Sequence, residues 1–245
     1  MRTVLTIAGA DPCGGAGIQS DIKTFEAFGL RGLSAVTALT AQNRRGVQAA
    51  FNVPAPFLIR QIEVLLEEFR IDAVKIGILG SYANLKAVTG VIKEKRFKNV
   101  VLDPVLRSTG GFPLIDKRGV KGMAELLPYV TVATPNIPEA EAISGMNVDS
   151  VEDMDEAARY IASLGVPFVL IKGGHLKGRP IDVFFDGKGL HRFKGTRLRG
   201  LEERFHGTGC MLSAAIACCL AMGLPPIQAA EEAKAYVERT LAKRK

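Results

Sequence analysis

The chain has 245 residues, of which 47% are apolar and 23% are charged, with a formal net charge of +7. This is the composition of an ordinary globular protein, and it excludes disordered, collagen-like and coiled-coil chains. Because open α/β sheets often reach this length undivided, we expect one domain over residues 1–245. The longest apolar run, Cys210 to Leu224, covers about 15 residues, fewer than the roughly 20 that a membrane-spanning helix needs. It therefore predicts a buried helix.

Four cysteines are present, and they form neither a C-x-x-C pair nor a His/Cys cluster at zinc spacing. A zinc site and a disulfide framework are therefore not expected. The sequence starts on a strand-like run, Thr3 to Ala10, without a signal-peptide pattern, so we expect a cytoplasmic protein. Lysine and arginine are spread along the whole chain, and no RRM, KH or zinc-finger pattern appears. We therefore expect neither nucleic-acid nor membrane partners, despite the positive charge.

Short β-branched runs alternate with helical periods along the chain. The predicted strands are 3–8, 34–40, 73–78, 99–105, 130–134, 167–172, 182–185 and 190–193. Between them, residues 57–69 and 151–164 have apolar residues at helical spacing, and the second segment opens on a capping box from Ser150 to Asp153. This alternation predicts an α/β fold with a doubly wound, mostly parallel sheet that has helices on both faces. Ligands bind such sheets at the carboxyl ends of the strands.

A glycine-rich loop, Gly9 to Gly17, follows the first predicted strand, and a helix is predicted from about Ile18. Three glycines in four residues allow positive φ and close backbone approach, so this loop can wrap a small ligand or a phosphate. A tight strand-to-helix turn explains one or two of these glycines but hardly all of them, so the ligand-binding interpretation is favoured. The loop is not a dinucleotide fingerprint, because Ser20 replaces the third glycine and the strand ending at Gln42 lacks a ribose-binding acid. No Walker A signature occurs either.

The segment from His206 to Cys210, HGTGC, directly precedes the apolar helix, which is predicted to run to Met222. Two glycines around a threonine at a helix start present several unpaired N–H groups to one point, and the helix dipole adds positive potential. The segment therefore predicts an anion hole. A cysteine at the same helix start should have its pKa lowered from about 8.5. A glycine-rich helix entry with a buried cysteine is an equally supported interpretation.

Two further positions combine polar groups with strand ends. Asn136 and Glu139 stand three residues apart at a predicted helix start, where they can hold a hydrated Mg²⁺. The same pair fits a plain N-cap with Glu at N3, which is slightly favoured. Asp103 ends the apolar run from Val100, and a buried charge costs energy unless it is paired or used. A catalytic or metal-binding role is therefore favoured for Asp103 over a satisfied core carboxylate.

Taken together and in this order, these segments resemble the hydroxymethylpyrimidine/phosphomethylpyrimidine kinases of thiamin biosynthesis, within the ribokinase superfamily. The matching stretches are 6–9, 11–21, 37–43, 75–77, 102–105, 134–140, 172–175 and 206–210. The resemblance implies a ribokinase-like kinase, usually a homodimer, that uses ATP and Mg²⁺. It also implies two transfers, the first to the hydroxymethyl group of 4-amino-5-hydroxymethyl-2-methylpyrimidine and the second to the resulting monophosphate.

The resemblance also implies roles at the phosphoryl-transfer centre. Cys210 stands where the superfamily usually has an aspartate that acts as the base, and it inherits that role by position. The expected anion hole is lined by Gly207, Thr208 and Gly209. Asp103 is expected near the transferred phosphoryl group. Phosphoryl transfer needs mainly positioning and charge stabilisation, which such a set supplies.

By the same resemblance, the nucleotide and the metal have their own residues. Lys172 is expected to contact nucleotide phosphate, together with Thr208 and Asn136. Asn136 and Glu139 are expected to organise Mg²⁺ through water.

The pyrimidine is expected to face Gly9, Asp21 and Gln42. Three departures concern the shape of this pocket, because Cys13 stands where the family more often has serine, and Ile78 and Leu106 stand where methionine is common. A pyridoxal or pyridoxine kinase of the same superfamily is the alternative. Gln42 argues against it, because an amide can pair with the aminopyrimidine edge and a pyridoxal ring offers no such edge.

Other classes fit the sequence less well. A nucleic-acid-binding protein predicts clustered Lys and Arg with exposed aromatic residues, and an NAD-dependent oxidoreductase needs the missing ribose-binding acid. A thiol redox sensor needs a resolving cysteine near Cys210, whereas Cys218 lies two helical turns further on and is expected to face the interior.

Overall fold

The computed structural model describes residues 1–43, 45–174, 180–195 and 207–243. Its strands are β1 (Thr3–Ala10), β2 (Arg31–Asn43), β3 (Gly46–Asn52), β4 (Ala73–Ile76), β5 (Val100–Leu102), β6 (Val132–Ala133), β7 (Phe168–Ile171), β8 (Ile181–Phe185) and β9 (Leu190–Lys194). They form one nine-stranded sheet in the order β3-β2-β1-β4-β5-β6-β7-β8-β9. The strands from β2 through β7 in this order are parallel, and β3, β8 and β9 run antiparallel to their neighbours. The predicted mostly parallel sheet is confirmed.

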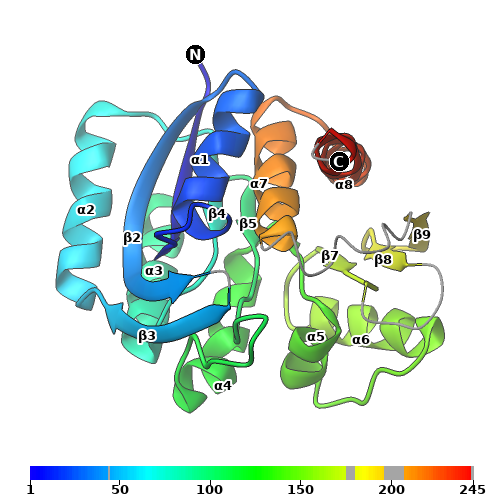
Figure 1. The fold of residues 1–245 in the computed structure, drawn as a ribbon. Helices are drawn as coiled ribbons and strands as arrows, with labels where there is room; N and C mark the ends of the chain where they lie inside the picture. The colour runs from blue at the N-terminus through cyan, green and yellow to red at the C-terminus, as the bar shows by residue number, and fades with distance from the viewer. Residues whose placement is uncertain (44, 175–179, 196–206, 244–245) are drawn as a thin grey trace.

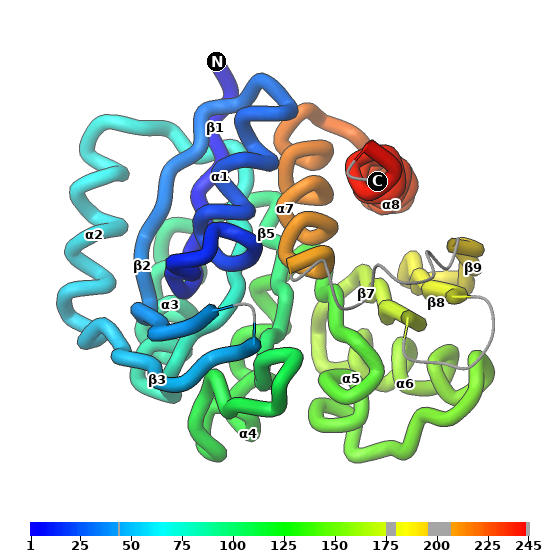
Figure 2. The backbone as a smooth tube through the Cα atoms, viewed as in Figure 1, coloured from blue at the N-terminus to red at the C-terminus, as the bar shows by residue number. Residues whose placement is uncertain are grey.

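Helices cover both faces of this sheet (Figures 1 and 2). They are α1 (Gly17–Ala27), α2 (Ala55–Glu68), α3 (Tyr82–Lys95), α4 (Lys117–Leu126), α5 (Ile137–Ser144), α6 (Val151–Ser163), α7 (Thr208–Ala221) and α8 (Pro226–Ala242), with a 3₁₀ turn at Leu127–Tyr129. One apolar core lies between one face of the sheet and the five helices from α2 through α6. A second core lies between the other face and helices α1, α7 and α8. The sheet therefore separates two layers of helices, as in other doubly wound folds.

Local sequence explains where several helices begin. The capping box predicted at Ser150 is present, because Ser150 Oγ accepts from the Asp153 N–H and the Asp153 carboxylate accepts from the Ser150 N–H. α7 begins instead after Gly207, which has a φ of +87°. The residues of α7 from Met211 to Ala221 are all buried, so the predicted buried helix is confirmed. Among the described residues, no helix combines the length and apolarity that crossing a bilayer requires.

Strand β3 is absent from the sequence prediction. Five of its seven residues are exposed, so it shows neither the alternation nor the apolar run by which strands are recognised. It forms because it pairs antiparallel with the far half of β2, from Ala38 to Asn43. The result is a two-stranded extension that projects at the carboxyl edge of the sheet (Figure 1).

Candidate active site

The carboxyl ends of four central strands meet the start of α7. Asp103 follows β5, Asn136 follows β6, Lys172 follows β7, and the glycine-rich loop follows β1. A Cβ atom built on Gly209 lies 3.2 Å from Lys172 Nζ and 3.9 Å from Asp103 Oδ2. The structure thus brings three of the predicted site residues to one point, as expected for ligand contacts in a parallel sheet.

The helix start itself depends on Gly207. Besides its positive φ, a Cβ atom at this position would lie 1.9 Å from Gly15 O, so no side chain fits. The backbones of the glycine-rich loop and of the segment before α7 are therefore in direct contact. Lys172 Nζ lies beside this helix start, where its charge and the positive end of the helix dipole are set against the negative charge of Asp103. His206, the first residue of the predicted motif, lies outside the described residues.

The Asp103 carboxylate is buried and is held by three side chains. Oδ1 accepts from Lys172 Nζ at 2.7 Å and from Thr134 Oγ1 at 3.4 Å, and Oδ2 accepts from Ser213 Oγ at 3.3 Å. Burial alone raises the pKa of Asp103, but the Lys172 and Lys75 ammonium groups outweigh it and hold the pKa below its usual value. The group is therefore ionised and paired, and its part in catalysis stays a prediction. Ser213 is not among the residues predicted from the sequence, although a hydroxyl group inside an apolar helix indicates a polar partner nearby.

The expectation that the Cys210 thiol has a lowered pKa is wrong. Burial raises the pKa of this thiol to about 11, and the nearby Asp103 and Asp21 carboxylates add to the rise, although the Lys75 ammonium opposes it. The position at a helix start is therefore outweighed by desolvation and by two negative charges. At neutral pH Cys210 is a thiol, and any base function uses a small ionised fraction.

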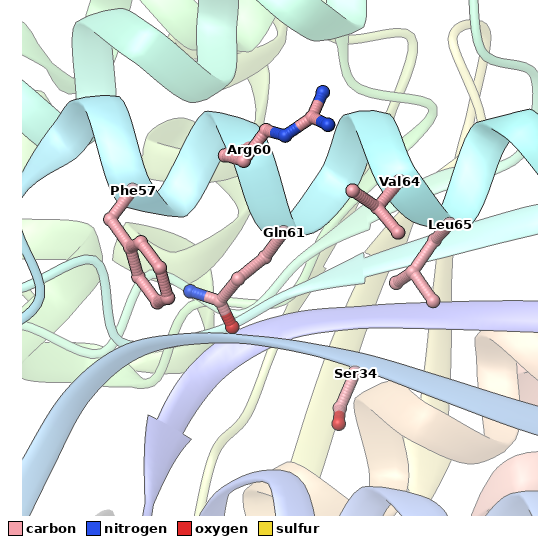
Figure 3. A pocket seen from close by; sticks show the side chains of 6 residues that line it. All are labelled: Ser34, Phe57, Arg60, Gln61, Val64 and Leu65. Atoms are coloured by element: carbon pink, nitrogen blue, oxygen red, sulfur yellow. The ribbon is translucent and has the colours of Figure 1, made fainter.

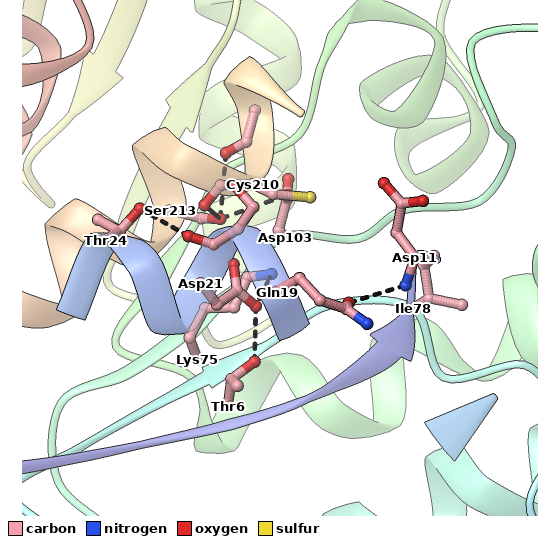
Figure 4. Close-up of polar contacts among 12 residues, drawn as sticks. Thr6, Asp11, Gln19, Asp21, Thr24, Lys75, Ile78, Asp103, Cys210 and Ser213 are labelled. Atoms are coloured by element: carbon pink, nitrogen blue, oxygen red, sulfur yellow. Dashed lines mark hydrogen bonds and ion pairs between the residues drawn. The ribbon is translucent and has the colours of Figure 1, made fainter. Parts of the chain in front are cut away.

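A buried ion pair lies beneath the thiol (Figure 4). Lys75 Nζ and Asp21 Oδ2 are 2.8 Å apart, both side chains are 0% exposed, and Thr6 Oγ1 donates to the same oxygen at 2.6 Å. Asp21 Oδ1 has no hydrogen-bond partner among the described residues. Burial lowers the pKa of Lys75, but Asp21, Cys210 and Asp103 raise it by more, so the lysine stays charged.

Lys75 has no role in the sequence prediction beyond its place in a matching stretch. The signal that identifies it is a lysine inside the apolar run of β4, because a fully buried lysine requires a partner. That partner, Asp21, is distant in sequence and lies in α1, one turn after Gly17. The structure therefore places the predicted substrate residue Asp21 inside the protein, where Lys75 and Thr6 fix its carboxylate.

Of the two ligands predicted for the glycine-rich loop, a small molecule or a phosphate, the structure disfavours the phosphate, because N–H groups of the loop already have a partner. Asp11 Oδ1 accepts from the Cys13 N–H, and Oδ2 accepts from the N–H groups of Gly15 and Ala16, at 2.8 to 3.0 Å. The carboxylate of the chain itself thus occupies the anion-binding concavity of this loop. Gly17, which has a φ of +58°, allows the loop to fold back over β1, since a Cβ there would lie 2.3 Å from Gly9 O.

The remaining predicted substrate residues lie at the edge next to this loop. Gly9, near the end of β1, packs against Ile78, whose Cδ1 is 3.4 Å from a Cβ built on Gly9. Gln42 is half-buried near the end of β2, with its Oε1 3.2 Å from Thr40 Oγ1. Thr40 Oγ1 also lies 2.8 Å from Ala10 O, which ties β2 to the start of the glycine-rich loop.

Asn136 and Glu139 form a complete capping box at the start of α5. Asn136 Oδ1 accepts from the Glu139 N–H at 2.9 Å, and Glu139 Oε2 accepts from the Asn136 N–H at 2.8 Å. The capping interpretation of this pair is therefore confirmed, and it engages one carboxylate oxygen of Glu139. Burial raises the pKa of Glu139 to about 7, although the charge of Lys172 opposes this rise.

These residues suit a hydrated magnesium ion better than an enclosed one. No group of three or more His, Cys, Asp or Glu side chains able to hold a metal occurs in the part of the chain that the structure describes. Mg²⁺ usually keeps several waters and binds one or two carboxylates together with substrate phosphates. The free oxygen of Glu139, beside Lys172 and Asp103, fits that mode.

A doubly wound sheet with a glycine-framed helix start, a lysine and carboxylates at its carboxyl edge defines the chain as a kinase of the ribokinase-like fold. The family model of phosphomethylpyrimidine kinase matches residues 11–245. The chain belongs to this family.

Individual relatives agree with this assignment. The thiamine biosynthesis bifunctional protein of Geobacter sulfurreducens is 45% identical over 237 residues, which cover 96% of this chain and 48% of that protein. The chain therefore spans about half the length of this relative. The crystal structure of phosphomethylpyrimidine kinase from Clostridium difficile 630 has a TM-score of 0.88 and 37% identity, and the match covers 98% of this chain and 100% of that one. Pyridoxal kinase of Bacillus subtilis, solved as an ADP complex, has a TM-score of 0.87 and 35% identity, with 96% and 89% covered.

Proposed function

We propose that the chain transfers the γ-phosphoryl group of ATP to 4-amino-5-hydroxymethyl-2-methylpyrimidine and then to the resulting monophosphate. The observation that carries this proposal is the meeting of Lys172, Asp103 and Cys210 at the start of α7, in a chain of this family. Pyridoxal kinase is the second candidate, because a solved pyridoxal kinase shares the fold at 35% identity. We further propose that residues 1–245 act as one cytoplasmic kinase domain.

In this proposal the chain supplies positioning and positive charge. The N–H groups of Thr208 and Gly209 and the Lys172 ammonium stabilise negative charge on the transferred phosphoryl group. Lys172 and Asn136 lie toward the nucleotide, and Asp103 holds Lys172 in place through the 2.7 Å contact. The thiolate form of Cys210 takes the proton of the attacking hydroxyl. Magnesium, when bound, neutralises phosphate charge and is held through water by Glu139 and Asn136.

The magnesium role of Glu139 is testable because glutamine also serves at this position of a capping box. Glu139→Gln is expected to raise the Mg²⁺ concentration for half-maximal rate several-fold while the melting temperature stays nearly unchanged. In the wild type this requirement should fall as pH rises through about 7, where the carboxylate ionises, and the variant should lack that dependence. Initial rates across Mg²⁺ titrations at several pH values measure both effects.

Asp153→Asn is the matched control, because it alters the same position of the α6 capping box, away from the site. Its Mg²⁺ requirement should equal that of the wild type. A Glu139→Gln variant with an unchanged Mg²⁺ requirement would limit Glu139 to its capping role.

Substrate choice is expected to depend on Gln42. The amide can accept from the exocyclic amine of the pyrimidine while donating to a ring nitrogen, and a ring without this edge leaves buried polar groups unpaired at roughly 1–3 kcal/mol each. Gln42→Met should therefore lower kcat/KM for the pyrimidine alcohol by at least about tenfold and narrow the gap to pyridoxal. ATP consumption with the alcohol, its monophosphate and pyridoxal, measured side by side, is the test of the proposed function. Equal efficiency of the wild type on pyridoxal would favour the second candidate.

We also propose that the chain forms a homodimer through the α2 side of the molecule. Phe57 and Val64 of α2 and Phe51 of β3 are 63%, 47% and 64% exposed. On this side a shallow groove of about 360 Å³ runs between α2 and β2 (Figure 3) and is lined by Ser34, Phe57, Arg60, Gln61, Val64 and Leu65. Large exposed apolar residues gathered in one area are typical of an interaction surface.

Charge placed on this surface is expected to separate the subunits. The double variant Phe57→Arg, Val64→Glu should sediment as a monomer at concentrations where the wild type sediments as a dimer. Tyr160, which is 40% exposed on α6, offers a control through Tyr160→Arg, which should leave the dimer intact. A wild type that sediments as a monomer would contradict this proposal.

A further inference from the structure

In the proposed function the two acceptors cannot bind with their rings in the same position. In the first transfer the attacking oxygen is the hydroxyl on the ring, and in the second it is an oxygen of the phosphate already attached to the ring. Gly207 at the start of α7 contacts Gly15, and Lys172 is ion-paired with Asp103 at 2.7 Å, so we take the reacting point to be the same for both acceptors. The ring of the monophosphate must therefore lie further from α7, by the length of one phosphate group.

The expected pyrimidine pocket, which Ile78 and Leu106 help to shape, continues into a further space at this edge of the sheet. This space is a cavity of about 590 Å³, within the range of small-molecule sites. Four segments enclose it, namely β2 with β3, the turn after β4, the segment after β5 into α4, and α5. Its lining is mostly apolar and includes Ala38, Ala50, Ile78, Leu106, Leu114 and Val120.

The cavity adjoins the expected ring position directly. Ile78 and Ala38 line the cavity, and the same two residues lie 3.4 Å and 3.5 Å from a Cβ built on Gly9, through Ile78 Cδ1 and Ala38 O. Ile78 is thus the shared wall between Gly9 and the cavity. Leu106 contributes to the cavity from the segment that begins at Asp103, so the lining continues from the reacting point.

The cavity also lies on the correct side of the sheet. α7, which starts at the reacting point, packs in the core with α1 and α8. The cavity is walled by α4 and α5, which pack in the core on the opposite face. At the carboxyl edge, where Figure 1 shows both β3 and the start of α7, a ring that moves away from α7 therefore moves toward the cavity.

We propose that this cavity receives the pyrimidine ring of the monophosphate during the second transfer, whereas the ring of the alcohol stays beside Gly9 during the first. This inference rests on the proposed function. In the second transfer a bond forms between an oxygen of the acceptor phosphate and the γ-phosphorus of ATP, and the bond from that phosphorus to the β–γ bridging oxygen breaks. ADP leaves with the electron pair of that bond, and the acceptor oxygen is already ionised at neutral pH.

Filling the cavity should therefore slow the second transfer more than the first. Ala50→Phe fills it from β3, and Val120→Phe fills it from α4. Each variant is expected to lower the ratio of kcat/KM for the monophosphate to kcat/KM for the alcohol by at least about tenfold. Both acceptors are assayed separately with ATP and Mg²⁺, and circular dichroism and thermal unfolding verify that each variant is folded.

Ala49→Phe is the matched control. Ala49 neighbours Ala50 in β3 but faces the other side of the strand, because successive side chains alternate, and it does not line the cavity. Its ratio should equal that of the wild type. An unchanged ratio in either folded filling variant, a parallel loss of both transfers, or the same fall in the Ala49 control would overturn the inference while leaving the proposed function in place. A wild type that phosphorylates neither pyrimidine acceptor would overturn both.

Discussion

Cys210→Ala is expected to retain its fold and ATP binding and to lose most of its turnover with the pyrimidine alcohol, by the factor of 10² to 10⁴ that removal of a general base usually causes. The physical reason is that the hydroxyl must give up a proton as it attacks. The loss should be smaller with the monophosphate, whose attacking oxygen is already ionised at neutral pH. Steady-state rates with each acceptor measure this difference. Unchanged turnover with the alcohol would exclude Cys210 as the base.

The raised pKa of Cys210 adds a pH dependence to this prediction. Because only the thiolate accepts a proton and its pKa is about 11, kcat with the alcohol should rise with pH from about 7 to 10. Cys210→Asp places a more acidic base at the same position and should remove that rise. Cys218→Ala is the control, since it removes a fully buried thiol of the same helix that packs in the core, and it should leave the pH profile unchanged.

Lys75→Met is expected to destabilise the protein by about 3–5 kcal/mol, because it leaves the Asp21 carboxylate buried without its counter-charge. The double variant Lys75→Met, Asp21→Asn removes both charges and should recover a large part of that loss. Urea unfolding of the wild type and both variants measures the difference.

An exposed pair provides the comparison for this effect. Lys95 and Glu94 are 2.7 Å apart, similar to the buried pair, but their side chains are 44% and 70% exposed. Lys95→Met should therefore change the free energy of unfolding far less than Lys75→Met. Equal effects of the two substitutions would mean that burial does not set the strength of the Lys75 interaction.

The sequence predicts the features of this protein that depend on local pattern. Alternating strands and helices, the capping box at Ser150 and the buried apolar helix α7 all follow from spacing within a short window, and all are confirmed. Strand β3 escapes prediction because its stability comes from pairing with β2 and not from its own residues. The residues of β3 have a pattern that is typical of a loop.

The predicted site residues also divide into those that the sequence places correctly and those whose properties depend on distant segments. The family resemblance predicts Asp103, Lys172 and Gly209 at one site, and the structure brings them together because strand ends of a parallel sheet converge. The pKa of Cys210 could not be predicted, because it depends on how much water the folded protein excludes and on carboxylates from distant segments. The lysine beneath the site was missed for a related reason, since its partner stands in another element.

The contact between Gly207 and Gly15 has a consequence for how activity appears during synthesis and refolding. These two glycines touch backbone to backbone, yet they belong to the first loop of the sheet and to the segment before α7, far apart in sequence. Contacts of such large separation require the loop-closure entropy to be overcome before they form, and they tend to form late. A nascent chain that has already built β1 to β7 has Asp103 and Lys172 in place but no helix start opposite them. Recovery of kinase activity after dilution from denaturant should therefore lag behind recovery of sheet structure.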